Sequence, residues 1–102
     1  MSQPKASKRR ANDARFHILL VDDHPVVLDG YQLMLNAQPD LAVCATAPNA
    51  ADALTAVERE LPDLVLTDLN MPGRGGLELI KDLVVLQPGI KVLVCSMHDE
   101  ML

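Results

Sequence analysis

The stretch FHILLVDDHP, residues 16–25, decides the fold of this chain. The run His17–Val21 is almost entirely apolar, which is typical of a strand buried on both faces of a sheet. Asp22 and Asp23 end the run, and Pro25 suits the first turn of a helix. A buried strand that leads directly into a helix indicates an α/β fold with a parallel sheet.

The same alternation continues towards the end of the chain. Apolar runs at 41–47, 64–67 and 91–95 predict three further strands. Asn49 is a candidate N-cap for the second of three helices, and Pro88-Gly89 marks the turn before the fourth strand. Apolar residues recur at helical spacing in the first helix, at Val26, Val27, Leu33, Met34 and Ala37. In the third helix we expect Leu77, Ile80, Leu83 and Val84 to face inward.

Length and composition limit the class of protein. A chain of 102 residues that is 49% hydrophobic suits one globular domain and excludes a disordered tail or a coiled coil. No apolar run is long enough to span a bilayer. Cys44 and Cys95 are too few for a disulfide framework, so we expect a reducing, cytoplasmic environment and two small buried thiols. We expect no membrane partner.

Charge is distributed unevenly. Residues 1–15 hold five basic residues and one acid, whereas the remainder holds four basic residues and 13 acids. We expect residues 1–15 to form a disordered basic arm and residues 16–102 to form the domain. The arm either contacts an anionic partner or serves as a solubilising tail. The acidic domain itself lacks the basic stripe of a nucleic-acid-binding surface.

Polar residues follow the predicted strands where each strand ends. They are Asp22 and Asp23 after the first strand, Asp68 after the third and Ser96 after the fourth. Because parallel strands end at one edge of a sheet, these side chains are expected to converge there. Two carboxylates about 5 Å apart repel by roughly 3 kcal/mol, so three together are unfavourable without a cation or a proton. Oxygen ligands suit Mg²⁺, with the Asn70 carbonyl as a further ligand.

A metal that keeps open coordination positions can hold a phosphoryl group beside a carboxylate nucleophile. Asp68 is the best candidate nucleophile because it stands alone before a glycine-rich loop. The hydroxyl of Ser96 can then donate a hydrogen bond to the phosphoryl group, an interaction that acts as a switch. We expect His24 and His98 to be solvent-facing loop residues.

Three motifs carry a family resemblance. They are ILLVDDHP at 18–25, DLVLTDLNMPG at 63–73 followed by Gly76, and VLVCSMH at 92–98. Together they resemble the receiver domain of a two-component response regulator, and their wording is similar to the LuxR-type branch, also called NarL/FixJ-like. The resemblance covers residues 16–102.

The resemblance implies a flavodoxin-like, or CheY-like, doubly wound sheet of strand order 2-1-3-4-5. It implies that Asp68 accepts a phosphoryl group from a sensor histidine kinase, and that the domain is not an enzyme beyond self-catalysed phosphorylation and dephosphorylation. The implied Mg²⁺ ligands are Asp22, Asp23, Asp68 and the Asn70 carbonyl. Ser96 matches the switch hydroxyl, and Asn70 and His98 match positions that tune the lifetime of the phosphoryl group.

The sequence departs from the family after residue 102, before the fifth strand, its lysine and the last helices. We therefore expect the order 2-1-3-4, no DNA-binding domain in this chain, and a fragment of a transcriptional regulator. The edge of the fourth strand would then be open to a second copy or to a full-length regulator.

Two alternatives remain. The first is a receiver-shaped interaction module that binds partners without productive phosphorylation. The second is a phosphatase of the haloacid-dehalogenase type, which also uses an aspartate at a strand end. That family needs a second acid two residues later, where this chain has Asn70, and an amide cannot serve as the general acid.

Overall fold

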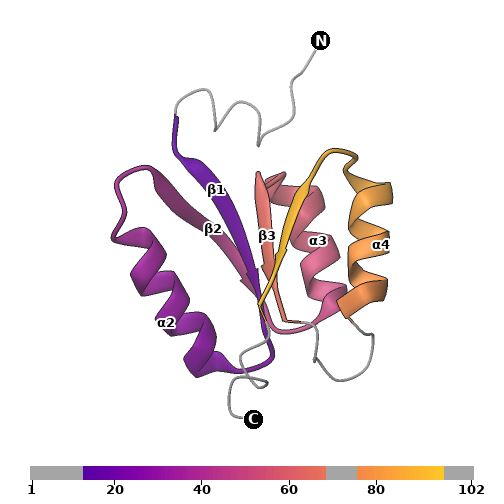
Figure 1. Ribbon diagram of the computed structural model, residues 1–102, viewed down its shortest axis with the longest axis horizontal. Coiled ribbons are helices and arrows are strands. Elements are labelled where there is room, and N and C mark those ends of the chain that lie inside the picture. Colours follow the sequence, from indigo (N-terminus) through magenta and orange to yellow (C-terminus); the bar gives the residue numbers. More distant parts are fainter. Residues whose placement is uncertain (1–12, 69–75, 96–102) are drawn as a thin grey trace.

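The computed structural model describes residues 13–68 and 76–95. Strands and helices alternate along this part of the chain, with helices on both faces of one sheet (Figure 1). The elements in chain order are β1 (Phe16–Val21), α2 (Pro25–Asn36), β2 (Leu41–Ala47), α3 (Ala50–Glu60), β3 (Leu64–Thr67), α4 (Gly76–Leu86) and β4 (Lys91–Val94).

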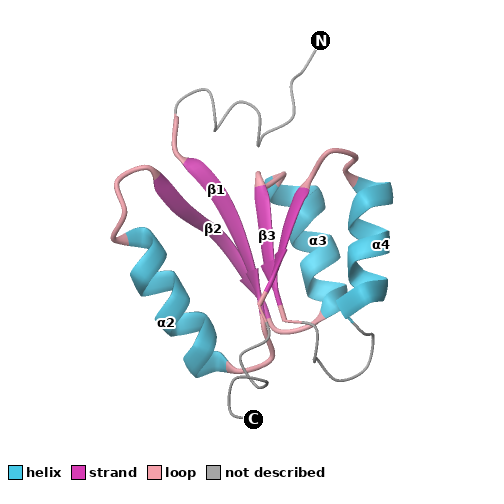
Figure 2. Cartoon of the chain, viewed as in Figure 1, coloured by secondary structure: helices cyan, strands magenta, loops and turns pink. Residues whose placement is uncertain are grey.

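The four described strands are all parallel and lie in the order β2-β1-β3-β4. This order confirms the predicted arrangement of a CheY-like sheet. Val21 at the end of β1 pairs with Thr67 at the end of β3, so these two strands end side by side. The carboxyl ends of the strands share one edge, at the arrowheads in Figure 2. Polar residues that follow the strands are brought together at that edge.

The core lies on both faces of the sheet because alternate residues of β1 point in opposite directions. Leu19 and Val21 pack towards α3 and α4, whereas Ile18 and Leu20 pack towards α2. All four side chains are no more than 3% exposed. The prediction of a first strand buried on both faces is confirmed.

Four of the five apolar residues of the expected stripe face solvent, three on α2 and Ala37 directly after it. Val26 is 83% exposed, Leu33 is 78% exposed and Met34 is 56% exposed. The expected stripe combined residues from neighbouring faces of the helix, because residues share a face only when they are about three, four or seven positions apart. The face that packs on the sheet is formed by Leu28, Tyr31 and Leu35.

The inward face of α4 agrees with the expectation at Leu83 and differs from it at Leu77 and Val84. Leu77 and Val84 are 67% and 51% exposed, whereas Leu79 and Leu83 are fully buried. Leu79 and Leu83 are four residues apart and lie on one face, while Leu77 and Val84 lie on another. Apolar residues occur all round this helix, so their spacing alone did not distinguish the buried face.

The predicted element boundaries agree closely with the structure. Strand β1 begins one residue before the predicted run, and β4 ends one residue before Cys95. Asn49 caps α3 as expected, since its side-chain oxygen accepts a hydrogen bond from the Asp52 N–H at 2.8 Å. Gly89 has a φ of +89°, a conformation that favours glycine, in the turn before β4.

Residues 13–15, which the sequence assigns to the basic arm, form a local network. The Arg15 guanidinium donates hydrogen bonds to the Asp13 carboxylate at 2.7 and 2.8 Å. Asp13 also lies 3.1 Å from Nε2 of His17, whose side chain is only 2% exposed. The bonds from Arg15 hold the pKa of Asp13 well below its ordinary value.

Cys44 and Cys95 are free thiols, and both are half-buried where full burial was expected. Each makes a polar contact, Cys44 with the backbone carbonyl of Ile18 and Cys95 with Tyr31.

In residues 13–68 and 76–95, no helix combines the length and the apolar character that crossing a membrane requires.

Candidate functional site

Asp22 and Asp68 are the first residues after the neighbouring strands β1 and β3. Backbone hydrogen bonds continue the sheet to these positions. The Asp22 N–H donates to the Ala47 carbonyl at 3.1 Å, and the Asp68 N–H donates to the Val21 carbonyl at 3.2 Å. Because the two backbones are held by the sheet, their side chains are directed to the same place.

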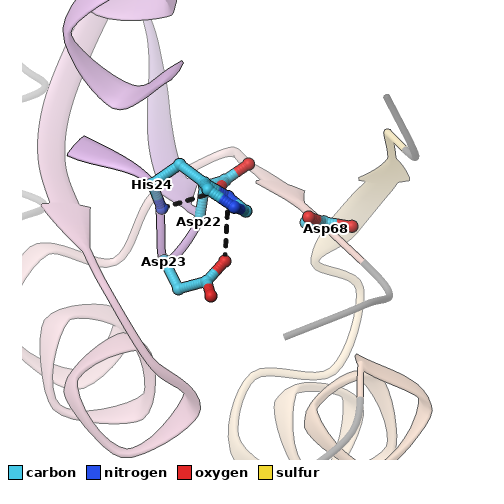
Figure 3. A group of neighbouring side chains, drawn as sticks. All are labelled: Asp22, Asp23, His24 and Asp68. Atoms are coloured by element: carbon cyan, nitrogen blue, oxygen red, sulfur yellow. Dashed lines mark hydrogen bonds and ion pairs between the residues drawn. The ribbon is translucent and has the colours of Figure 1, made fainter. Parts of the chain in front are cut away.

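The convergence of carboxylates expected at the strand ends is observed. Asp22, Asp23, His24 and Asp68 each offer one ligand atom, and these four atoms all lie within 4.8 Å of one another. Asp22 and Asp23 come from the segment that joins β1 to α2, and Asp68 faces them from the end of β3 (Figure 3). Asp22 is 8% exposed and Asp68 is 2% exposed, so two of the three carboxylates are buried.

His24 is the member of this cluster that sequence reasoning missed. Its side chain is 45% exposed, but the ring does not simply face solvent. Nδ1 lies 2.8 Å from Oδ1 of Asp22 and 3.0 Å from Oδ1 of Asp23 (Figure 3). The His24 backbone N–H donates to the same Asp22 oxygen at 2.9 Å. The sequence did contain a signal for this contact. His24 directly follows two acids, in a segment too short to hold its side chain away from theirs.

The surrounding acids raise the pKa of His24 above its ordinary value of 6.5. The hydrogen bond to Asp22 is the largest cause, and the negative charges of Asp23 and Asp68 add to it. Partial burial acts in the opposite direction, because it disfavours the charged imidazolium. A protonated His24 therefore neutralises part of the negative charge of the cluster.

The donor set fits a hard divalent cation. Three carboxylates from two adjacent segments provide oxygen atoms within a few ångströms, and carboxylate oxygens are ligands that Mg²⁺ prefers in proteins. Two of these carboxylates are buried. A cation beside them, in addition to protonated His24, offsets the repulsion between the carboxylates more effectively there than it would in water. The other predicted site residues, Asn70, Ser96 and His98, lie outside the described residues.

A narrow hollow adjoins the cluster on the α2 side. Asp22 and Asp68 line one part of it, and Tyr31 and Cys95 line another. The Cys95 N–H donates to the Thr67 carbonyl at 2.8 Å, which extends the pairing of β4 with β3 beside Asp68. The end of β4 is thus held next to the acidic cluster.

Comparison with known proteins gives consistent matches. The family model described as "Response regulator receiver domain" matches residues 18–102. The transcriptional regulatory protein DegU of Brevibacillus brevis is 35% identical over 89% of this chain and 39% of its own length. The nitrate/nitrite response regulator protein NarL of Escherichia coli K12 is 40% identical over 81% of this chain and 39% of its own length.

A solved structure gives the same picture. A two-component response regulator of the LuxR family from Aurantimonas sp. SI85-9A1 superposes with a TM-score of 0.78 at 36% identity. The match covers 82% of this chain and 60% of the solved chain. The present chain spans about two fifths of the length of the curated relatives given above.

Proposed function

Because the chain belongs to the response regulator receiver domain family, we propose that Asp68 accepts a phosphoryl group from the phosphohistidine of a sensor histidine kinase in the cytoplasm. One observation carries the proposal. The Asp68 carboxylate is 2% exposed at the end of β3, with oxygens of Asp22 and Asp23 within 4.8 Å. A single buried acid with a structural role would not need two further carboxylates beside it, because like charges repel one another.

In this proposal Asp22, Asp23 and Asp68 hold Mg²⁺, and the backbone carbonyl of Asn70 completes the protein ligands. The ion supplies positive charge that neutralises the carboxylates and the phosphoryl oxygens. Asp22 is fixed by the sheet and by its contacts with His24, so it provides a rigid side of the site. Asp23 has its own contact with His24 and provides the other side.

The reaction itself requires little of the protein beyond positioning. A carboxylate oxygen of Asp68 attacks phosphorus, a P–O bond forms, and the P–N bond to the kinase histidine breaks. The donor imidazole leaves with the bonding electron pair and takes up a proton, and Asp68 becomes an aspartyl phosphate. Ser96 serves as the switch hydroxyl that binds a phosphoryl oxygen, and Asn70 and His98 tune how long the group persists.

We further propose that this receiver domain is part of a transcriptional regulator. The support is that the chain matches transcriptional regulators such as DegU over 39% of their length. The domain would be a phospho-acceptor whose only catalysis is its own phosphorylation and dephosphorylation.

An experiment with a small phosphodonor tests the role of Asp68. The protein is incubated with Mg²⁺ and acetyl phosphate, and intact mass and amide NMR spectra are recorded. We expect a mass increase of one phosphoryl group and shifts around Asp68, both absent in Asp68→Ala. The matched control is Asp40→Ala, which removes an exposed acid that precedes β2 at the opposite edge of the sheet. A wild-type protein that shows neither change would refute the proposal.

A second candidate is a receiver-shaped interaction module that associates with a second copy of the chain through β4. The support is that Leu93 and Val94 are 55% and 38% exposed, and that β4 pairs only with β3 among the described strands. Light scattering after size exclusion, at several concentrations, tests it. A dimer that is lost in Leu93→Asp and kept in Asp68→Ala would favour the module, whereas a monomer at all concentrations would refute it.

A further inference from the structure

A hydrogen bond joins the middle of α2 to the end of β4. The hydroxyl of Tyr31 lies 2.9 Å from Sγ of Cys95, although the two residues are 64 positions apart in sequence. Either group can donate. Both side chains are half-buried, so the contact is partly screened from water. It is a direct side-chain connection between these two elements.

Tyr31 is well anchored on its own side. Its ring packs against the buried cluster of Ile18, Leu20 and Leu28 beneath α2. Helix α2 begins directly after His24, whose carbonyl accepts hydrogen bonds from the N–H groups of Val27 and Leu28. The position of the Tyr31 hydroxyl is therefore tied both to the core and to the loop that carries Asp22 and Asp23.

Cys95 lies beside the candidate site, at the end of β4 and next to Asp68. It is the residue after β4, and its N–H donates to the Thr67 carbonyl, directly before Asp68. Both side chains of the pair line the same narrow hollow as Asp22 and Asp68. In sequence Cys95 is followed by Ser96, the proposed switch hydroxyl. Whatever holds Cys95 limits the freedom of this strand end beside Asp68.

We propose that Tyr31 is a positioning residue for phosphorylation of Asp68, and that it acts through the Cys95 thiol by holding the end of β4 against β3. This inference rests on the proposed function. The hydroxyl is the part of Tyr31 that matters, because the ring alone is enough to fill the core under α2. The Cys95 thiol matters as a hydrogen-bonding group, so a hydroxyl group at the same position should replace its function.

Kinetics of phosphorylation test the proposal. Tyr31→Phe keeps the ring and removes the hydroxyl. We expect phosphorylation by acetyl phosphate and Mg²⁺ to slow by about 2- to 10-fold, the factor that corresponds to one hydrogen bond. Cys95→Ala should slow it equally, and the double variant should show no further loss because both changes remove the same contact. Cys95→Ser keeps a hydroxyl partner and should restore most of the rate.

Two controls complete the design. Gln32→Ala changes an exposed neighbour on α2 and should leave the rate unchanged. Alkylation by iodoacetamide, followed by peptide mapping that separates Cys95 from Cys44, should be faster at Cys95 in Tyr31→Phe. This readout follows the contact itself and does not depend on phosphorylation.

The possible results distinguish a failure of the Tyr31 positioning role from a failure of the proposed phosphorylation of Asp68. Equal phosphorylation rates in the wild type and Tyr31→Phe, or an additional loss in the double variant, would overturn the positioning role and leave the proposed function intact. A wild-type protein that is not phosphorylated at all would refute the proposed function and the positioning role with it. Slower phosphorylation in Tyr31→Phe, recovered activity in Cys95→Ser and no additional loss in the double variant support the role.

Discussion

Nδ1 of His24 lies 2.8 Å from Oδ1 of Asp22, so one imidazole bridges the acids that follow β1. The same nitrogen is 3.0 Å from Oδ1 of Asp23. Three carboxylates and one histidine therefore form a single electrostatic unit whose charge depends on the protonation of His24.

In the Mg²⁺-free protein, the pKa of His24 should be above 6.5, because the hydrogen bond to Asp22 and the nearby acids favour the imidazolium. Titration of the imidazole resonances by NMR measures this value directly. Asp22→Asn should lower the pKa, and Asp29→Asn, an exposed change on α2, should leave it unchanged. A His24 pKa at or below 6.5 in the wild type would contradict the geometry.

The raised pKa of His24 also has a consequence for stability. The imidazolium contributes stabilisation that is fully present below the unfolded value of 6.5 and is lost as pH rises through the folded pKa. The free energy of unfolding without Mg²⁺ should therefore fall across this window more in the wild type than in His24→Gln. Urea titrations at several pH values test this. Parallel pH profiles for the two proteins would show that His24 makes no such contribution.

Removal of one carboxylate from the cluster should stabilise the metal-free protein. Asp68→Asn keeps the shape of the side chain and removes a buried negative charge near Asp22 and Asp23. We expect a gain of about 1 to 3 kcal/mol in the free energy of unfolding, the scale of like-charge repulsion at this separation. Urea unfolding measures the change, and a destabilised variant would argue against net repulsion in the cluster.

Mg²⁺ should stabilise the wild-type protein because it binds the folded cluster and not the unfolded chain. At 100 times the dissociation constant the gain is about 2.7 kcal/mol. Asp23→Ala should lose most of this gain, whereas Asp40→Ala, at the other edge of the sheet, should retain it. Thermal unfolding with and without Mg²⁺ compares the three proteins, and an equal response from all of them would place the ion elsewhere.

Two leucines on α4 test which face of the helix supports the sheet. Leu79 is fully buried and Leu77 is 67% exposed, although they are two residues apart. Leu79→Ala should reduce the free energy of unfolding by about 2 to 5 kcal/mol, because it leaves a cavity in the core. Leu77→Ala should change it by less than about 0.5 kcal/mol. Chemical denaturation of both variants checks this, and the reverse ranking would show that the other face is buried.

The strands were predictable from sequence because each is a short apolar run with a clear end. The limits of β2 and β3 were predicted to the residue, and Asp22 and Asp68 stand directly beyond β1 and β3. Since parallel strands share one carboxyl edge, the convergence of these acids followed from local patterns and one general rule. The roles of Asp68 and its neighbours in phosphorylation remain predictions.

The helix faces were less predictable. Leu77, Val84 and Val85 are apolar and exposed, so hydropathy does not separate them from the buried Leu79 and Leu83. A helix that is apolar on several sides has more than one plausible inward face. The packing of α4 on α3 and the sheet selects among them.

The sequence by itself determined the order of the elements, the parallel sheet and the acids at its carboxyl edge, because strand length, apolar runs and chain breaks are local properties. Only the tertiary structure decided that His24 bridges Asp22 and Asp23, which helix faces are buried, and that Tyr31 meets Cys95. These features depend on distances between segments that pack against each other. A linear pattern records which residues are present, whereas only the packing records which of them touch.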